Sequence, residues 1–191
     1  MNTSLALSRF FIFLLLSIAL LPIMQGQSTS SILSFEGEVI FLSDAPQEKI
    51  TARSDELKGM IDTLRNTFAF QIPVRSFIGF NSDLQRQHFN ENYMESHRYP
   101  NISYAGKILG TIDYDQEGTY KVKTKGTFNI HGREQEEIII NRVIITENEI
   151  TIESSFTLRL AQYDIRIPRI VEKKISPEIE IQMTVTNTKS T

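Results

Sequence analysis

The sequence predicts an all-β fold of about eight antiparallel strands, with one short helix set among them. Apolar and polar residues alternate in one segment after another. Residues typical of turns separate these segments at short, regular intervals. An antiparallel barrel and an antiparallel sandwich both fit this pattern, because both architectures bury one face of the sheet and expose the other to solvent. No internal repeat or linker divides the chain, so we expect one domain.

The first 26 residues have the features of a secretory signal peptide. Arg9 precedes an apolar run over 10–23, and Gly26 offers a small residue for cleavage. The run has about 14 residues, whereas a transmembrane helix needs roughly 20. No cysteine follows it, which excludes a bacterial lipoprotein anchor. We therefore expect cleavage after residue 26, a mature domain of residues 27–191, and a periplasmic or secreted location.

Charge and cysteine content exclude several classes of protein. The chain has a net charge of −3, and without residues 1–26 it keeps 19 basic and 23 acidic side chains, a net charge of −4. This balance disfavours a nucleic-acid-binding protein. The chain has no cysteine, so neither disulfides, thiol chemistry nor a Cys-based metal site is possible. The stability of the domain must come from core packing.

Alternation predicts the strands before the helix. We expect a first strand over 32–42, a turn at 44–46 and a second strand over 49–52. Residues 57–61 form either a third strand or a bend around Gly59. A further strand over 68–72 carries unusually large inward side chains.

One helix is expected over residues 82–95. Ser82 and Gln85 have the spacing of a capping box, in which two side chains satisfy free backbone N–H groups. Pro100 cannot continue a helix. The alternation that follows, over 102–108, predicts a strand. We expect this helix to lie beside the mouth of the barrel.

Regular hairpins follow the helix. We expect strands over 120–130, 138–145, 150–160 and 179–185, turns at 115–118, 131–133 and 147–148, and a short extended piece over 163–167. In the segment 138–145 both parities are apolar, so the sequence does not determine which side chains point inward. This segment is either covered on both faces or carries a bulge.

The chain carries no motif of a known catalytic site. It has no GxSxG, HExxH, P-loop or GxGxxG pattern. We therefore expect no enzyme activity and no cofactor. His88, His97 and His131 leave a metal site open as an alternative, but their spacing matches no ligand pattern and nothing imposes zinc geometry. Three lysines over 121–125 alternate with the inward parity of the predicted strand, which we interpret as a solvated strand face rather than a nucleic-acid site.

Large apolar side chains gather on the inward parity of the predicted strands and in the segments around the helix. A closed barrel of about eight strands has an interior that side chains just fill or that holds one small ligand. Bulky walls without charges would select an apolar molecule. The candidate ligand-binding residues are Phe68, Phe70, Phe77, Phe89, Tyr104, Tyr120, Phe128, Phe156, Leu158 and Met183. The alternative is that they form an ordinary core.

Three segments resemble the YceI-like family of exported lipid-binding proteins: HFNENYMESHRYPNISYAGKI, GTYKVKTKGTFNIHG and FTLRLAQYDIRIP. The matching positions are His88, Phe89, Tyr99, Pro100, Ile102, Tyr104, Gly126, Phe128, Ile130, His131, Gly132, Tyr163 and Ile165. The resemblance covers roughly residues 70–185. It departs at Arg133-Glu134, where the family commonly has Val-Thr, and in the amino-terminal section.

The resemblance implies an antiparallel lipocalin-like β-barrel that holds a long isoprenoid or similar apolar chain. Together with the residue patterns, it predicts a non-enzymatic binding protein whose partner is an isoprenoid, a quinone or another lipid, and not a nucleic acid. Two alternatives stay open. One is an interaction or stress-response module with a filled core, and the other, less favoured, is a metal site that uses the histidines.

Overall fold

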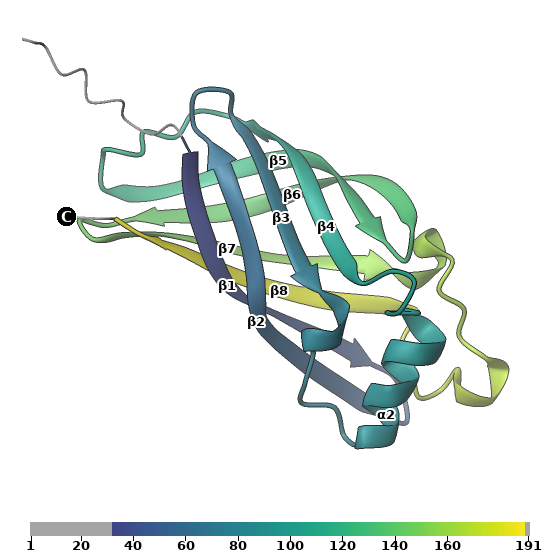
Figure 1. Cartoon of the computed structure of the whole chain (residues 1–191). Helices are drawn as coiled ribbons and strands as arrows, with labels where there is room; N and C mark the ends of the chain where they lie inside the picture. The colour runs from purple at the N-terminus through teal and green to yellow at the C-terminus, as the bar shows by residue number, and fades with distance from the viewer. Residues whose placement is uncertain (1–31, 190–191) are drawn as a thin grey trace, which may run out of the picture. The chain divides into compact units, whose positions relative to one another are not determined.

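The computed structural model of the protein describes residues 32–189, and over this range the chain forms a closed antiparallel barrel of eight strands (Figure 1). The predicted fold class is therefore confirmed. The expected signal peptide, residues 1–26, lies outside the described residues. Within the described range, no helix has the length and apolar character needed to cross a membrane.

The strands follow one another around the barrel in chain order, and β1 pairs with β8 to close it. Every neighbouring pair is antiparallel. The strands are β1 (Ile32–Asp44), β2 (Lys49–Asp62), β3 (Thr67–Pro73), β4 (Asn101–Leu109), β5 (Gly118–Ile130), β6 (Arg133–Ile145), β7 (Glu149–Arg159) and β8 (Glu178–Thr188).

Two expected elements differ in the structure. β2 is one continuous strand, where the sequence predicted a strand over 49–52 and a separate strand or bend over 57–61. Gly59 does not bend the chain. A Cβ atom at this position would lie 2.1 Å from Cδ1 of Phe70, so the glycine allows the Phe70 ring to lie against β2. The extended piece expected over 163–167 is not a strand, because η3 (Leu160–Tyr163) ends there and Asp164 is left-handed, with a φ of 57°.

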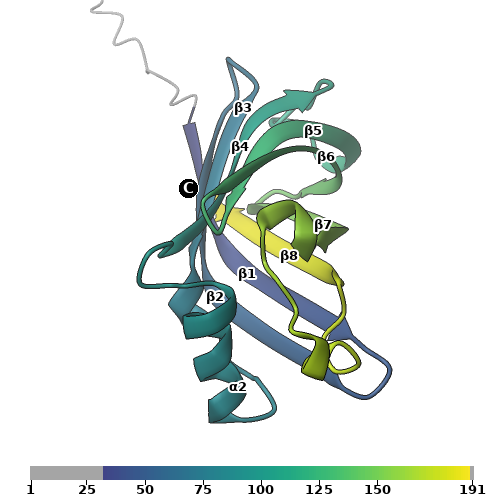
Figure 2. The ribbon, with the colours of Figure 1, turned by 90° about the vertical axis from the view of Figure 1, so that its right-hand side faces the viewer.

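The predicted helix is present as α2 (Asp83–His88), which continues into a π-helical turn, η2 (Phe89–Tyr93). Ser82 Oγ accepts a hydrogen bond from the backbone N–H of Gln85 at 3.2 Å, as a capping residue does. The Gln85 side chain accepts from the N–H of Asn81 rather than of Ser82. Two shorter helices are η1 (Val74–Ser76) and η4 (Arg169–Val171). α2 lies at the end of the barrel where β1 turns into β2 (Figures 1 and 2).

The structure decides the orientation of β6, which the sequence left open. Ile139, Val143 and Ile145 point into the barrel and are buried, whereas Ile138 and Ile140 are 55% and 50% exposed. Neither covered faces nor a bulge explain the double apolar pattern. The outward isoleucines pair with lysines of the neighbouring strand β5, whose long side chains lie beside them on the outer face.

Candidate functional site

The barrel encloses a cavity of about 350 Å³ that is lined by residues from all eight strands, from α2 and η2, and from η3. The lining is almost entirely apolar. The volume lies at the lower end of the range of roughly 300–1,000 Å³ that is typical of small-molecule sites. The interior is therefore not completely filled by side chains, which removes the main support for the filled-core alternative.

Nine of the ten candidate residues proposed from the sequence line this cavity, and they are Phe68, Phe70, Phe77, Phe89, Tyr104, Phe128, Phe156, Leu158 and Met183. Tyr120 does not line it. Its ring lies near the start of β5, and its hydroxyl donates to the carbonyl oxygen of Gln116 at 3.1 Å, in the preceding turn. Parity alone could not distinguish a residue beside the cavity from one packed at the far end of the barrel.

Aromatic rings form one side of the cavity wall. Tyr104 stacks on Phe128 with ring centroids 4.1 Å apart, and its ring centroid lies 4.8 Å from that of Phe68. Phe128 also contacts Phe156, at 5.6 Å. These rings come from β3, β4, β5 and β7, so the strip runs across the sheet. Such rings offer a broad apolar surface with little rotamer freedom to lose on binding.

A second group of rings connects the helical segment to the barrel. Phe89 of η2 lies 5.1 Å from Phe80, 5.6 Å from Phe41 and 5.8 Å from Phe77, measured between ring centroids. Phe41 and Phe80 also line the cavity but were not among the candidates. Phe41 had the inward parity of β1, which was the available signal. Phe80 lies in an irregular segment, where no periodicity marks the inward side chains.

A short polar band interrupts the apolar lining. Asn141 donates through Nδ2 to Thr124 Oγ1 at 3.1 Å, and Ser154 bonds to Asn141 Oδ1. The Tyr104 hydroxyl donates to the carbonyl oxygen of Glu137 at 3.2 Å and lies 3.2 Å from Thr124 Oγ1. Each member has a partner, so the band costs little to bury. Sequence reasoning missed it because Asn141 stands in the apolar run whose orientation was ambiguous.

Tyr163 adds a hydroxyl that the protein leaves unsatisfied. Its side chain is 1% exposed and lines the cavity. Within residues 32–189 its hydroxyl has no hydrogen-bond partner. Burial raises the pKa of this hydroxyl to about 12, so at neutral pH it is a protonated, unused donor. An unpaired buried hydroxyl costs about 1–3 kcal/mol, which a hydrogen-bond acceptor on a ligand would remove.

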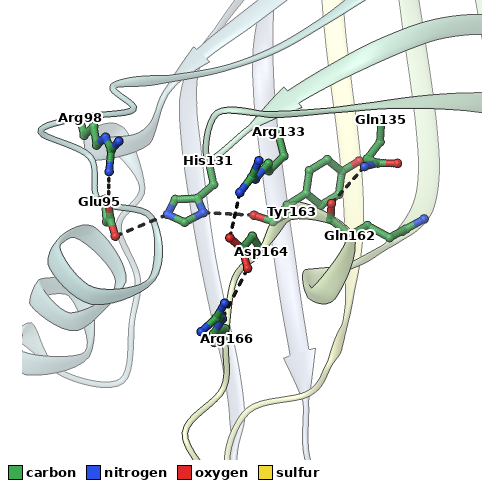
Figure 3. A network of polar contacts seen from close by, with 9 residues as sticks. All are labelled: Glu95, Arg98, His131, Arg133, Gln135, Gln162, Tyr163, Asp164 and Arg166. Carbon is green, nitrogen blue, oxygen red and sulfur yellow. Dashed lines mark hydrogen bonds and ion pairs between the residues drawn. The ribbon is translucent and has the colours of Figure 1, made fainter.

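His131 lies between η3 and the segment that follows η2 (Figure 3). It occupies the β5–β6 turn with a φ of 52°. Its Nδ1 lies 3.1 Å from the carbonyl oxygen of Tyr163, which can only accept, so Nδ1 carries the proton. Its Nε2 lies 3.8 Å from Glu95 Oε1, just beyond η2. Among the described residues Nε2 has no hydrogen-bond partner, so this histidine ties the β5–β6 turn to η3 and only lies near the end of the helical segment.

The three histidines do not meet. His131 is bonded as described above, His88 lies at the rim of the cavity, and His97 is exposed elsewhere on the surface. In the part of the chain that the structure describes, no group of three or more His, Asp or Glu side chains could hold a metal ion. The metal-site alternative thus has no geometric support.

Polar side chains surround the rim beside α2. Gln85 donates through Nε2 to Glu48 Oε1 at 2.6 Å, and Asn81 donates to the same oxygen at 3.1 Å. These bonds hold the start of α2 against the β1–β2 turn. Among the described lining residues, the basic side chains are His88 and Lys174, and both are exposed at the rim. The deep part of the cavity therefore contains no cation that could neutralise an anionic group.

A closed eight-stranded antiparallel barrel around an apolar cavity is the architecture of barrels that hold one small ligand. The sequence model of the YceI-like domain matches residues 24–187, and the chain belongs to this family. The resemblance inferred from the three sequence segments is thus confirmed. A comparison with curated protein sequences finds no significant match.

Solved structures share the fold at low sequence identity. A polyisoprenoid binding domain from Saccharophagus degradans, implicated in plant cell wall breakdown, superposes with a TM-score of 0.69 at 15% identity, covering 85% of this chain and 100% of that one. BcnA from Burkholderia cenocepacia superposes with a TM-score of 0.65 at 13% identity, and the match covers 81% of this chain and 96% of BcnA. The Campylobacter jejuni YCEI protein superposes with a TM-score of 0.58 at 14% identity, and the match covers 73% of this chain and 85% of that protein.

Proposed function

We propose that this protein is an exported, non-enzymatic binding protein that holds one isoprenoid- or lipid-like molecule inside its barrel. The observation that carries the proposal is the apolar cavity of about 350 Å³. The shared fold with a domain described as polyisoprenoid binding supports the class of ligand. Export is supported by the charge, length and flanks of residues 1–26.

Burial of the ligand's apolar surface would drive binding. Each 100 Å² of apolar surface removed from water contributes about 2.5 kcal/mol. Loss of translational freedom and ordering of a flexible chain offset a large part of this gain. The aromatic strip around Tyr104 and Phe128 is already packed in place, so the protein itself would lose little freedom on binding.

The polar groups favour a ligand with an uncharged polar end. A quinone carbonyl or a prenol hydroxyl could accept from the free Tyr163 hydroxyl. A phosphate placed at the same depth would have no cation beside it. We therefore favour a neutral head inside the barrel, and an anionic head, if the ligand has one, near Lys174 at the rim.

Solvent extraction of the purified protein, followed by mass spectrometry, tests the proposal. We expect an apolar molecule in near-stoichiometric amount, and binding of an added isoprenoid alcohol or quinone where the preparation is empty. Ile139→Trp fills the cavity and should abolish binding. Ile138→Trp, on the neighbouring outward residue, is the matched control. The proposal fails if no apolar molecule is recovered or bound, or if both variants bind like the parent protein.

A further inference from the structure

The outer face of β4, β5 and β6 carries a compact patch of basic and aliphatic side chains. Strand pairing places Lys107, Lys125 and Ile138 in one row, and Leu109, Lys123 and Ile140 in the next. Lys121 pairs with Arg142 in a third row. Directly paired residues on one face have Cβ atoms about 4.5–5.5 Å apart. We call these eight residues the β4–β6 patch.

The patch is basic on a protein that is acidic overall. The chain has a net charge of −3, yet five cations gather here and all are exposed. Lys125 pairs with Glu136 at 2.9 Å, and Arg142 pairs with Glu153 at 3.4 Å. Among residues 32–189, no carboxylate forms an ion pair with Lys107, Lys121 or Lys123. These three cations are free to meet an anionic surface.

The aliphatic members are unusually accessible for their size. Ile138 is 55% exposed, Ile140 50% and Leu109 45%. Exposed aliphatic residues are ordinary when scattered singly. Here they stand in two adjacent rows, interleaved with lysines whose methylene stems enlarge the apolar area. Mixed basic and aliphatic surfaces suit the boundary between lipid headgroups and acyl chains.

The patch adjoins a gap in the hydrogen-bonded wall of the barrel. β6 pairs with β7 over residues 141–145 and 150–154. Beyond these, 133–140 pair with β5 alone and 155–159 with β8 alone. β7 leads directly into η3 on this side of the barrel (Figure 2). The cavity is closed here without a backbone ladder, by side chains such as Ile139 and Phe156 and by η3, which a hydrogen bond from Gln135 to the Gln162 carbonyl oxygen ties to β6.

We propose that the β4–β6 patch docks the protein on the surface of an anionic lipid bilayer, and that the ligand passes between bilayer and cavity through the neighbouring β6–β7 gap. Lysines attract anionic headgroups, and Ile138 and Ile140 enter the interface beside the gap. An apolar molecule then avoids a passage through water. The transfer step rests on the proposed function, whereas the docking step does not.

Vesicle flotation tests the docking step with the full domain and no added ligand. We expect binding to phosphatidylcholine vesicles that contain phosphatidylglycerol, no binding to phosphatidylcholine alone, and weakening by salt. Lys121→Glu with Lys123→Glu should lower the affinity on the order of thirtyfold or more, because each lysine near an anionic surface contributes roughly a fivefold factor in affinity. Ile138→Ser with Ile140→Ser should cause a smaller loss.

The matched control is Arg169→Glu with Lys173→Glu, which makes the same charge change on exposed residues outside the patch. The docking proposal is overturned if no variant of the protein binds anionic vesicles, or if the control loses as much affinity as the lysine variant. Self-association that disappears with the isoleucine variant would also overturn it, since a second copy would then cover the patch. Tighter binding of the patch to duplex nucleic acid than to anionic vesicles would also overturn the docking proposal.

Transfer kinetics separate the two proposals. Protein loaded with a fluorescent isoprenoid analogue should release it to anionic vesicles, and the lysine variant should slow this release while retaining the same ligand affinity in solution. An unchanged release rate overturns the exchange route. If the cavity binds no apolar molecule at all, the proposed function fails, and the flotation result still decides whether the patch docks.

Discussion

The β1–β2 side and the β6–β7 side of the barrel are closed by different means. β1 and β2 pair along nearly their whole length, with a single register shift between Gly37 and Val39. β6 and β7 pair over a short stretch, and packed side chains together with η3 close the rest. A ladder of backbone bonds is cooperative, whereas side-chain closure opens locally at a lower free energy. We therefore expect the β6–β7 side to open more easily than the β1–β2 side.

Amide hydrogen exchange tests this comparison directly and carries the largest expected effect. Amides that bond between β1 and β2 should exchange only on global unfolding. Amides of 134–140 and 155–159 that face the gap have no ladder partner, so they should exchange on the order of a hundredfold faster or more. Equal protection in both regions would show that the side chains close the gap as firmly as a ladder.

Truncation of one buried ring on each side should give unequal losses of stability. Phe35 on β1 is 1% exposed, and Phe35→Ala should lower the free energy of unfolding by about 3–5 kcal/mol. Phe156 on β7 is partly exposed and already faces the cavity. Phe156→Ala should cost roughly half as much. Urea denaturation of both variants measures the difference, and similar losses would contradict a looser β6–β7 side.

The polar band should hold β6 and β7 together at the point where their ladder ends. Asn141→Ala leaves the Ser154 and Thr124 hydroxyls without their shared partner. We expect a loss of about 1–3 kcal/mol and faster amide exchange in the neighbouring ladder. Asn129→Ala, on the β5 strand outside the band, is the control. A neutral effect of Asn141→Ala would mean that water or a small shift replaces these bonds.

Tyr163 should give the smallest effect, visible at high pH. Its pKa is raised to about 12 from 10.0 by burial. Between these values the unfolded chain loses the proton first, so the unfolded state is favoured as pH rises from about 10 to about 12. Tyr163→Phe should reduce the loss of unfolding free energy over this pH range by up to about 2 kcal/mol. It should leave stability at pH 7 unchanged or slightly higher. If the free energy of unfolding of the parent protein and of Tyr163→Phe fell in parallel with pH, Tyr163 would not be the group that causes the decline.

Local patterns were enough to predict most of the elements. Alternation on strands such as 120–130 and 150–160 has period two, and burial of one face makes this pattern readable without knowledge of the neighbouring strands. The capping pair Ser82 and Gln85 similarly located the start of α2. Most candidate wall residues follow from the same parity, whereas Phe77 and Phe89 come from the segments around the helix, and nine of the ten candidates border the cavity. Whether they bind a ligand stays a prediction.

Other features depended on partners distant in the chain. Asn141 lies inside the barrel because Thr124 and Ser154 from the flanking strands satisfy it, and nothing in its own apolar run indicates this. Gly59 lies within a strand that pairs on both sides, and the Phe70 ring of the next strand occupies the space that a side chain at residue 59 would need. Tyr163 is buried in a cluster with residues from other parts of the chain such as Val74, Phe128 and Ile139, and His131 of the β5–β6 turn bonds to its carbonyl oxygen.

By itself the sequence determined the fold class, the order of the strands and the apolar character of the interior, because these follow from short-range periodicity, turn residues and family motifs. The tertiary structure decided where the interior is filled and where it is empty. It also decided where the β6–β7 ladder stops and which lysines meet which isoleucines on the outer face. Packing between distant segments sets these features, and no single stretch of sequence encodes it.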